Sequence, residues 1–310
     1  MSNPLVCIII LNYCSLEDTL KCIETIRQID YPTFRILAID NASPDGGGKI
    51  LQAQLPAAEF IQLPKNTGYA GGNNEGISRA LQEGADYVFI VNPDVRLPPD
   101  SIRSYVDIME ADKTIGALNP IQLCHDGKTI DDKFRRGIFE AHKYSVPDLN
   151  ADSPEQWEVR TLYGAALMFP AKTVKKVGGF DPLYFAYNEE EDFCRRITYR
   201  GMRLVVTAKA PVRHMRTKES EEVDDFRLFL RLKGSYLFKL KEPLRSFWRS
   251  LKIVDRDIWD GLLGRRRHKY PFDSYPIRRR HIVKSALWLV WNLQEVRKHR
   301  RMEQLGRSYV

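Results

Sequence analysis

The sequence of 310 residues has only five cysteines, and no two of them form a CxxC pair. An odd, small number of cysteines in a chain of this length favours a reduced, cytoplasmic protein over one held by a disulfide framework. Cys7 and Cys22 lie within apolar patterns, so we predict that both are small core residues. A basic segment followed by an apolar segment is not visible at the N-terminus, and we therefore expect no signal peptide.

Long apolar runs and several common ligand-binding signatures are also absent. The longest apolar candidate, residues 286–293, is far shorter than the ~20 residues that span a bilayer, so we expect no membrane-spanning helix. The chain has neither a GxGxxG fingerprint nor the Gly-Lys-Ser/Thr of a P-loop. It also lacks RRM, KH and zinc-finger patterns, so nucleic acid is not an expected partner.

The positive net charge of +8 is confined to the C-terminal part of the chain. Residues 1–220 carry 26 Lys and Arg against 29 Asp and Glu, whereas residues 221–310 carry 22 against 11. We therefore divide the chain into a first domain, residues 1–219, and a basic, aromatic-rich helical extension, residues 220–310. The charge of the extension predicts an anionic partner.

The first domain alternates short apolar runs with amphipathic segments. Strands are predicted at residues 5–11, 35–39, 59–63, 88–91, 115–119, 159–169 and 203–207. Helices are predicted between the first four strands, and again at residues 100–111, 171–177 and 188–200. This alternation predicts an α/β fold with a mostly parallel central sheet flanked by helices. Residues 120–156 are polar and poorly periodic, which fits either a functional lid or a mobile segment.

Asn92-Pro93-Asp94 follows the apolar strand at residues 88–91. Proline cannot donate to a strand ladder, so the strand should end there and Asp94 should project from its tip. The ends of parallel strands are where open α/β sheets bind ligands, and a carboxylate is a hard oxygen ligand for a divalent cation. The alternative is that these residues form only a turn.

The stretch KNTGYAGGNN, residues 65–74, is rich in glycine and asparagine and precedes an amphipathic helix. Glycine permits close backbone approach to a ligand, and a helix N-terminus favours an anion. A loop followed by an ordinary helix cap is the alternative interpretation.

Four consecutive acids, Glu189 to Asp192, follow Asn188, a predicted helix N-cap. Acids in a first helical turn complement the helix dipole. Consecutive helical positions turn by ~100°, however, so at least one acid should face a site rather than solvent. His214 stands alone in the sequence, and a lone histidine is more often structural than a metal ligand.

The extension is predicted to contain three helices, at residues 223–241, 244–263 and 274–301. Aromatic residues are interleaved with three basic clusters, Arg265–Arg267, Arg278–Arg280 and Arg297–Arg301. Aromatics at helical spacing are most often core, and arginine runs are most often solvated. Together they favour an extension that lies on an anionic membrane surface, with internal packing or a homodimer as the alternatives.

Seven motifs follow one another in a fixed order: ILNY, IDNASPDG, KNTGYAGGNNEGI, FIVNPDVRLPPDSI, GAALMFP, VGGFDPLYFAYNEEEDFCRRITYRG and VRHMRT. This ordered set, covering residues 4–217, resembles family 2 inverting glycosyltransferases of the GT-A fold, especially rhamnosyltransferase-like members. The extension lies outside the resemblance.

The resemblance implies a nucleotide-sugar site formed by Asn12, Tyr13, Asp40, Gly71, Gly72, Asn73 and Asn92. Asn92-Pro93-Asp94 stands where the family has its DxD motif, with Asn in place of the first acid. Asp94 and His214 would then be ligands of Mg²⁺ or Mn²⁺, which reverses the interpretation of the lone histidine.

The acidic stretch corresponds to the family segment that holds the general base, which implies a catalytic role for Glu190 or Glu189. The family has Asp where this chain has Glu190, so the choice between the two stays open. Gly164 and Asp192 are assigned to the acceptor side.

The activity implied is metal-dependent, inverting transfer of rhamnose from dTDP-rhamnose, or of another sugar from a UDP-sugar. The acceptor would be a glycan or lipid-linked glycan in cell-surface polysaccharide synthesis, at the cytoplasmic face of the membrane. The alternative is a non-catalytic module with the same fold that binds a membrane or a polyanion.

Overall fold

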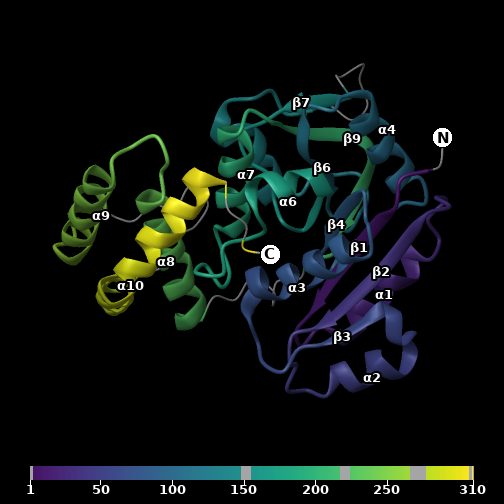
Figure 1. Ribbon diagram of the computed structural model, residues 1–310, viewed down its shortest axis with the longest axis horizontal. Coiled ribbons are helices and arrows are strands. Elements are labelled where there is room, and N and C mark those ends of the chain that lie inside the picture. Colours follow the sequence, from purple (N-terminus) through teal and green to yellow (C-terminus); the bar gives the residue numbers. More distant parts are fainter. Residues whose placement is uncertain (1–2, 148–154, 217–223, 266–276, 307–308, 310) are drawn as a thin grey trace.

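A computed structural model describes residues 3–147, 155–216, 224–265, 277–306 and 309 (Figure 1). Its centre is a nine-stranded sheet in the order β3-β2-β1-β4-β8-β6-β9-β5, with β7 paired to β9. Helices cover both faces of this sheet, and three C-terminal helices form a separate group beside it (Figure 1).

The first half of the sheet is parallel, as the sequence predicts. It consists of β1 (Val6–Asn12), β2 (Phe34–Asp40), β3 (Phe60–Gln62) and β4 (Tyr87–Val91). The connecting segments are α1 (Leu16–Ile26), α2 (Gly47–Gln54), the short η1 (Ala57–Glu59) and α3 (Gly68–Gln82). Alternate residues of β1 enter different cores, with Cys7 and Ile9 on one face and Ile8 and Ile10 on the other. Burial on both faces explains why β1 is apolar throughout.

The second half of the sheet is mixed, with antiparallel strands added to a further parallel pair, β6 and β9. Strand β8 (Ala166–Pro170) is antiparallel to both β4 and β6 (Ile115–Leu123). Strand β9 (Arg203–His214) runs parallel to β6 and antiparallel to β5 (Val95–Arg96) and β7 (Gln156–Glu158).

The strand predicted from residue 159 begins only at Ala166. The Asn119 side chain explains the delay, because its amide accepts from Tyr163 N at 2.7 Å and donates to Tyr163 O at 3.0 Å. These bonds satisfy the Tyr163 backbone outside a strand ladder. The remaining elements of the first domain are α4 (Ser101–Ala111), α5 (Asp132–Phe134), η2 (Arg135–Phe139), η3 (Glu140–His142), α6 (Ala171–Val177) and α7 (Glu189–Tyr199).

The extension contains α8 (Asp225–Leu240), α9 (Phe247–Leu262) and α10 (Arg279–Leu305). They share an apolar cluster with members from all three helices, and Tyr184 of the first domain belongs to it. The proposed boundary at residue 219 and part of the Arg265–Arg267 cluster lie outside the described residues. Of the described helices, none combines the length and apolar character needed to cross a bilayer.

Candidate active site

Asp94 and His214 meet at the ends of two neighbouring strands. Pairing of β5 with β9 sets Val95 opposite His214, and the Asp94 Oδ2 atom lies 3.2 Å from His214 Nε2. The other imidazole nitrogen, Nδ1, lies 3.0 Å from Gln122 Oε1, which orients the ring. Asn92 is half-buried at the end of β4, two residues before Asp94. The structure thus brings together two residues that are 120 positions apart in the chain.

The Asp94–His214 pair suits part of a divalent cation site. Burial raises the pKa of Asp94, but contacts with His214 and the charge of Arg216 outweigh it, leaving the pKa below its ordinary value. An ionised carboxylate and an imidazole are both ligands of Mn²⁺, and a carboxylate also suits Mg²⁺. Among the described residues, no cluster of three or more His, Cys, Asp or Glu is placed to hold a metal. The pair would therefore depend on diphosphate and water oxygens for further ligands.

Asn12 and Asp40 lie together at the ends of β1 and β2, and their side chains are hydrogen-bonded to each other. Asn12 Nδ2 donates to Asp40 Oδ1 at 2.7 Å, while Ser43 N and Gln62 Nε2 donate to Asp40 Oδ2 at 3.0 and 2.8 Å. Asp40 is 1% exposed and Asn12 is fully buried, whereas Tyr13 is 46% exposed. In this arrangement Tyr13 is the one of the three with its side chain open to solvent.

The Gly-Asn stretch is helical from Gly68 onward, where α3 begins, and only its first three residues lie outside the helix. A Cβ atom on Gly72 would lie 2.5 Å from the Leu11 side chain, so this glycine lets α3 approach β1. Gly71 is within the same first turns, and Asn73 is fully buried. Close packing between helix and strand therefore accounts for Gly72 without a ligand.

Tyr69 is a site residue that the sequence interpretation missed. Its hydroxyl donates to Gly164 O at 2.8 Å, and a Cβ on Gly164 would come within 2.5 Å of that hydroxyl. Burial and the charges of Glu190, Glu189 and Asp94 raise the pKa of Tyr69 well above its ordinary value. Tyr69 is therefore within electrostatic range of both Asp94 of the metal-ligand pair and the acidic stretch. The sequence signal that could have identified Tyr69 is that it is the aromatic residue within KNTGYAGGNN.

Glu189 and Glu190 begin helix α7 and differ in their surroundings. Glu189 is 3% exposed, whereas Glu190 is only partly buried. The Oε2 atom of each is shielded from solvent and has no hydrogen-bond partner. Such unpaired carboxylate oxygens are costly, and they are available to a ligand hydroxyl.

The pKa values separate the two carboxyl groups. Burial and then the charge of Glu191 raise the pKa of Glu190 to about 7. Burial and the charge of Glu190 raise the pKa of Glu189 well above its ordinary value. Burial thus favours the neutral form of Glu189, while Glu190 titrates near neutral pH, which is the behaviour a general base requires.

A family model described as "Glycosyl transferase family 2" matches residues 6–178. The chain belongs to glycosyl transferase family 2.

Two curated relatives and two solved structures show what this glycosyltransferase is similar to. N-acetylglucosaminyl-diphospho-decaprenol L-rhamnosyltransferase of Mycobacterium tuberculosis (strain H37Rv) is 25% identical over 237 residues, covering 69% of this chain and 77% of the relative. Rhamnosyltransferase WbbL of Escherichia coli (strain K12) is 24% identical over 213 residues, covering 61% of this chain and 75% of the relative.

The mannosyltransferase PcManGT from Pyrobaculum calidifontis, in complex with GDP-Man and Mn²⁺, superposes with a TM-score of 0.57 at 15% identity, covering 98% of this chain and 85% of that one. S. aureus TarS 1–349 in complex with UDP-GlcNAc superposes with a TM-score of 0.53 at 14% identity, covering 79% of this chain and 69% of that one. These structures confirm the expected α/β GT-A fold.

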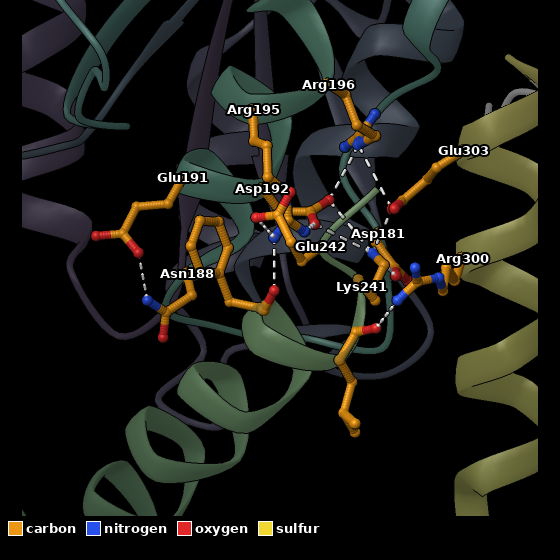
Figure 2. Close-up of polar contacts among 12 residues, drawn as sticks. Asp181, Asn188, Glu191, Asp192, Arg195, Arg196, Lys241, Glu242, Arg300 and Glu303 are labelled. Carbon is orange, nitrogen blue, oxygen red and sulfur yellow. Dashed lines mark hydrogen bonds and ion pairs between the residues drawn. The ribbon is translucent and has the colours of Figure 1, made fainter. Parts of the chain in front are cut away.

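Asp192 of this glycosyltransferase does not lie where an acceptor could reach it, so its acceptor-side assignment is corrected. Its carboxylate is fully buried and bonds Arg195 at 2.7 Å, Arg196 at 2.9 Å and Lys241 at 3.3 Å (Figure 2). These cations lower its pKa far below the ordinary value despite burial. Asp192 therefore holds α7 in place, while Gly164 lies against the Tyr69 hydroxyl.

Proposed function

We propose that this glycosyltransferase is an inverting enzyme with Glu190 as its general base. The observation that carries the proposal is that Tyr69 interacts electrostatically with both Glu190 and Asp94, while Glu190 keeps a carboxylate oxygen without a hydrogen-bond partner and Asp94 lies 3.2 Å from His214. Glu190 takes the proton of the acceptor hydroxyl as that oxygen bonds to the anomeric carbon. The bond from that carbon to the diphosphate breaks in the same displacement, and the configuration inverts.

Asp94 and His214 would hold Mg²⁺ or Mn²⁺ beside the diphosphate. When bound, such an ion offsets the negative charge that grows on the leaving group. Asp94 is suited to this role because its pKa lies below the ordinary value, so it is ionised at neutral pH. Tyr69 donates to Gly164 O and interacts electrostatically with both Asp94 and Glu190.

The donor we propose is dTDP-rhamnose, with a UDP-sugar as the second candidate. The names of the two bacterial relatives support rhamnose, and one of them names a diphospho-decaprenol acceptor. A lipid-linked glycan in cell-surface polysaccharide synthesis, reached from the cytoplasmic face of the membrane, is therefore the proposed acceptor.

The donor is tested by thermal shift with dTDP-rhamnose, UDP-glucose, UDP-GlcNAc and GDP-mannose, each with and without Mn²⁺. A ligand that binds the native state raises its melting temperature, and 100-fold saturation corresponds to about 2.7 kcal/mol. We expect the largest rise in melting temperature with dTDP-rhamnose plus Mn²⁺. In a separate assay, we expect rhamnose to be transferred from this donor to a lipid-diphosphate-GlcNAc acceptor. Donor binding without transfer or hydrolysis would instead favour the non-catalytic module.

The outward face of α10 supports membrane binding by the extension. Four neighbouring apolar side chains are 44 to 83% exposed on it: Val283, Leu287, Val290 and Trp291. Exposed basic residues lie at both ends of this patch: Arg279, Arg280, Lys298 and Arg301. An apolar patch with cationic flanks suits the interface of an anionic bilayer. The third basic cluster is not wholly solvated as predicted, since Arg300 is buried and donates to Leu240 O.

Vesicle sedimentation tests this face with the L287S/W291S double variant. We expect wild-type protein to bind phosphatidylglycerol vesicles, to bind less at high salt, and to bind neutral phosphatidylcholine weakly. The double variant should bind at least about tenfold more weakly, because each buried apolar side chain contributes roughly 1.5–3 kcal/mol. I50S, at an exposed position on α2, is the matched control. Unchanged binding by the double variant would contradict the assignment, and a concentration-dependent dimer would indicate a second copy instead.

A further inference from the structure

Helix α8 of the extension packs directly against the residues that precede Glu189. A Cβ atom on Gly234 would lie 2.6 Å from Asn188 Oδ1 and 2.7 Å from Tyr187 O. No side chain fits at position 234 without moving the backbone of that segment, so α8 approaches it as closely as a helix can. The extension is therefore in contact with the start of the helix that carries the proposed base.

The contacted segment, residues 185–188, has an unusual backbone. Phe185, Tyr187 and Asn188 have φ values of 66°, 70° and 70°, although none of them is glycine. The left-handed conformation disfavours such residues and persists where surrounding contacts enforce it. Asn188 does not cap α7 as predicted, because its side-chain amide donates to Glu191 Oε2 at 2.5 Å.

Contacts on two sides hold this segment. On one side, Ala70 N of α3 donates to Phe185 O at 3.1 Å, and Gly68 packs against the same carbonyl. On the other side, the Arg231 guanidinium of α8 stacks over the Tyr187 ring at 4.3 Å. Because α3 and α8 enclose the turn, displacing either helix would move the residues that follow it.

Charged groups of α8 also act on the glutamates. Arg231 lowers the pKa of Glu190 and opposes the effect of burial and of Glu191. Lys233 donates to Leu183 O at 2.8 Å, and its charge interacts with Glu189. The remaining groups that interact electrostatically with Glu190 are Glu189, Glu191 and Cys194 of α7, Tyr69 of α3, and Tyr163.

A second set of contacts fixes the middle of α7 to the extension (Figure 2). The fully buried Lys241 amine bonds Asp181, Asp192 and Glu303, the last from α10. Arg196 of α7 approaches Glu303 at 3.5 Å. A buried ionic network of this kind tolerates little displacement, because each separated charge would remain without a partner. Helix α7 is therefore held by the extension at its start and along its length.

We propose that helix α8 is part of the active site, with Arg231 and Gly234 as positioning residues that hold the Tyr187–Asn188 turn and thereby fix the Glu190 carboxylate toward the acceptor hydroxyl. The inference rests on the proposed function, because it assumes that Glu190 is the base. It assigns a role in glycosyl transfer to a helix outside the segment that matches the family model.

The test compares R231Q and R231K with the charge-matched control R249Q on the exposed face of α9. In R231Q, loss of a cation beside Glu190 should move the acid limb of the kcat profile to higher pH by about one unit. The kcat at pH 7 should fall about fivefold, because the ionised fraction of Glu190 drops from about one half to about one eleventh, while the donor Kd stays within about twofold of wild type. R231K should recover part of the shift, and R249Q should match wild type. If R231Q had the same acid limb and the same kcat as the wild type, the proposal would be overturned.

Two further measurements keep the inference separate from the proposed function. Carboxyl-carbon NMR should show a higher titration midpoint for Glu190 in R231Q than in wild type, whether or not any tested sugar is transferred. An unchanged midpoint would overturn the role of Arg231. G234A should lose kcat with donor affinity retained, whereas S235A on the next position should not. A wild type inactive with every donor would count against the proposed function alone.

Discussion

Replacing Glu190 by Gln is expected to reduce transfer by about 10²- to 10⁴-fold, the usual contribution of a general base, while donor binding is retained. Gln has nearly the same shape as Glu but cannot take the acceptor proton. The Glu190 Oε2 atom has no hydrogen-bond partner, so a bound acceptor hydroxyl that reached it would supply one. Transfer to a glycan acceptor and donor affinity, measured separately, check the prediction.

E189Q is the matched control for E190Q. Burial raises the pKa of Glu189 well above its ordinary value and so favours its neutral form, which an amide resembles in shape and charge. E189Q should therefore retain most of the activity. The reverse pattern, with E189Q inactive and E190Q active, would move the base to Glu189.

The pH profile gives an independent check on the same residue. A base acts in its ionised form, so transfer should rise with pH as Glu190 loses its proton around pH 7, where burial places its pKa. An unperturbed glutamate would give a limb near pH ~4.3 instead. A limb at that lower position would show that Glu190 is not the group that limits the rate.

The first half of the fold was predictable because its information is local. Each of β1 to β3 is followed by a helix that leads to the next parallel strand, and right-handed crossovers leave few ways to arrange such units. The antiparallel β8 was less predictable, because the Asn119 side chain, 44 residues before Tyr163, decides where that strand begins. Long-range bonds of this kind leave no periodic signal in the sequence.

The candidate site was likewise predictable only in part from the sequence. Motif order alone placed Asp94, His214, Glu189 and Glu190 in one site, and the structure brings the first pair within 3.2 Å. Sequence could not separate Glu189 from Glu190, because the difference between them is one of burial. It also assigned Asp192 by adjacency, whereas the helix turns this carboxylate toward Lys241. The role of α8 was invisible because its contacts arise from tertiary packing alone.

Replacing Asp94 by Asn is expected to lower metal-dependent transfer by at least about 10²-fold, since removing ~3 kcal/mol of stabilisation of the leaving diphosphate has that effect on rate. The amide keeps the shape of Asp94 but lacks the charge that holds a divalent cation. His214 alone would remain of the pair, and the described residues contain no third acid or histidine to replace the lost ligand.

The sharpest measurement for D94N is the shift in melting temperature that Mn²⁺ adds to a saturating nucleotide-sugar. That increment should disappear in D94N, while the melting temperature without ligands should change less, because a neutral amide at this position no longer requires burial of a charge. D100N, an isosteric change at an exposed position before α4, should keep the full increment. If D94N kept it too, the cation would be bound elsewhere, and Asn92-Pro93-Asp94 would act as a turn rather than as a ligand segment.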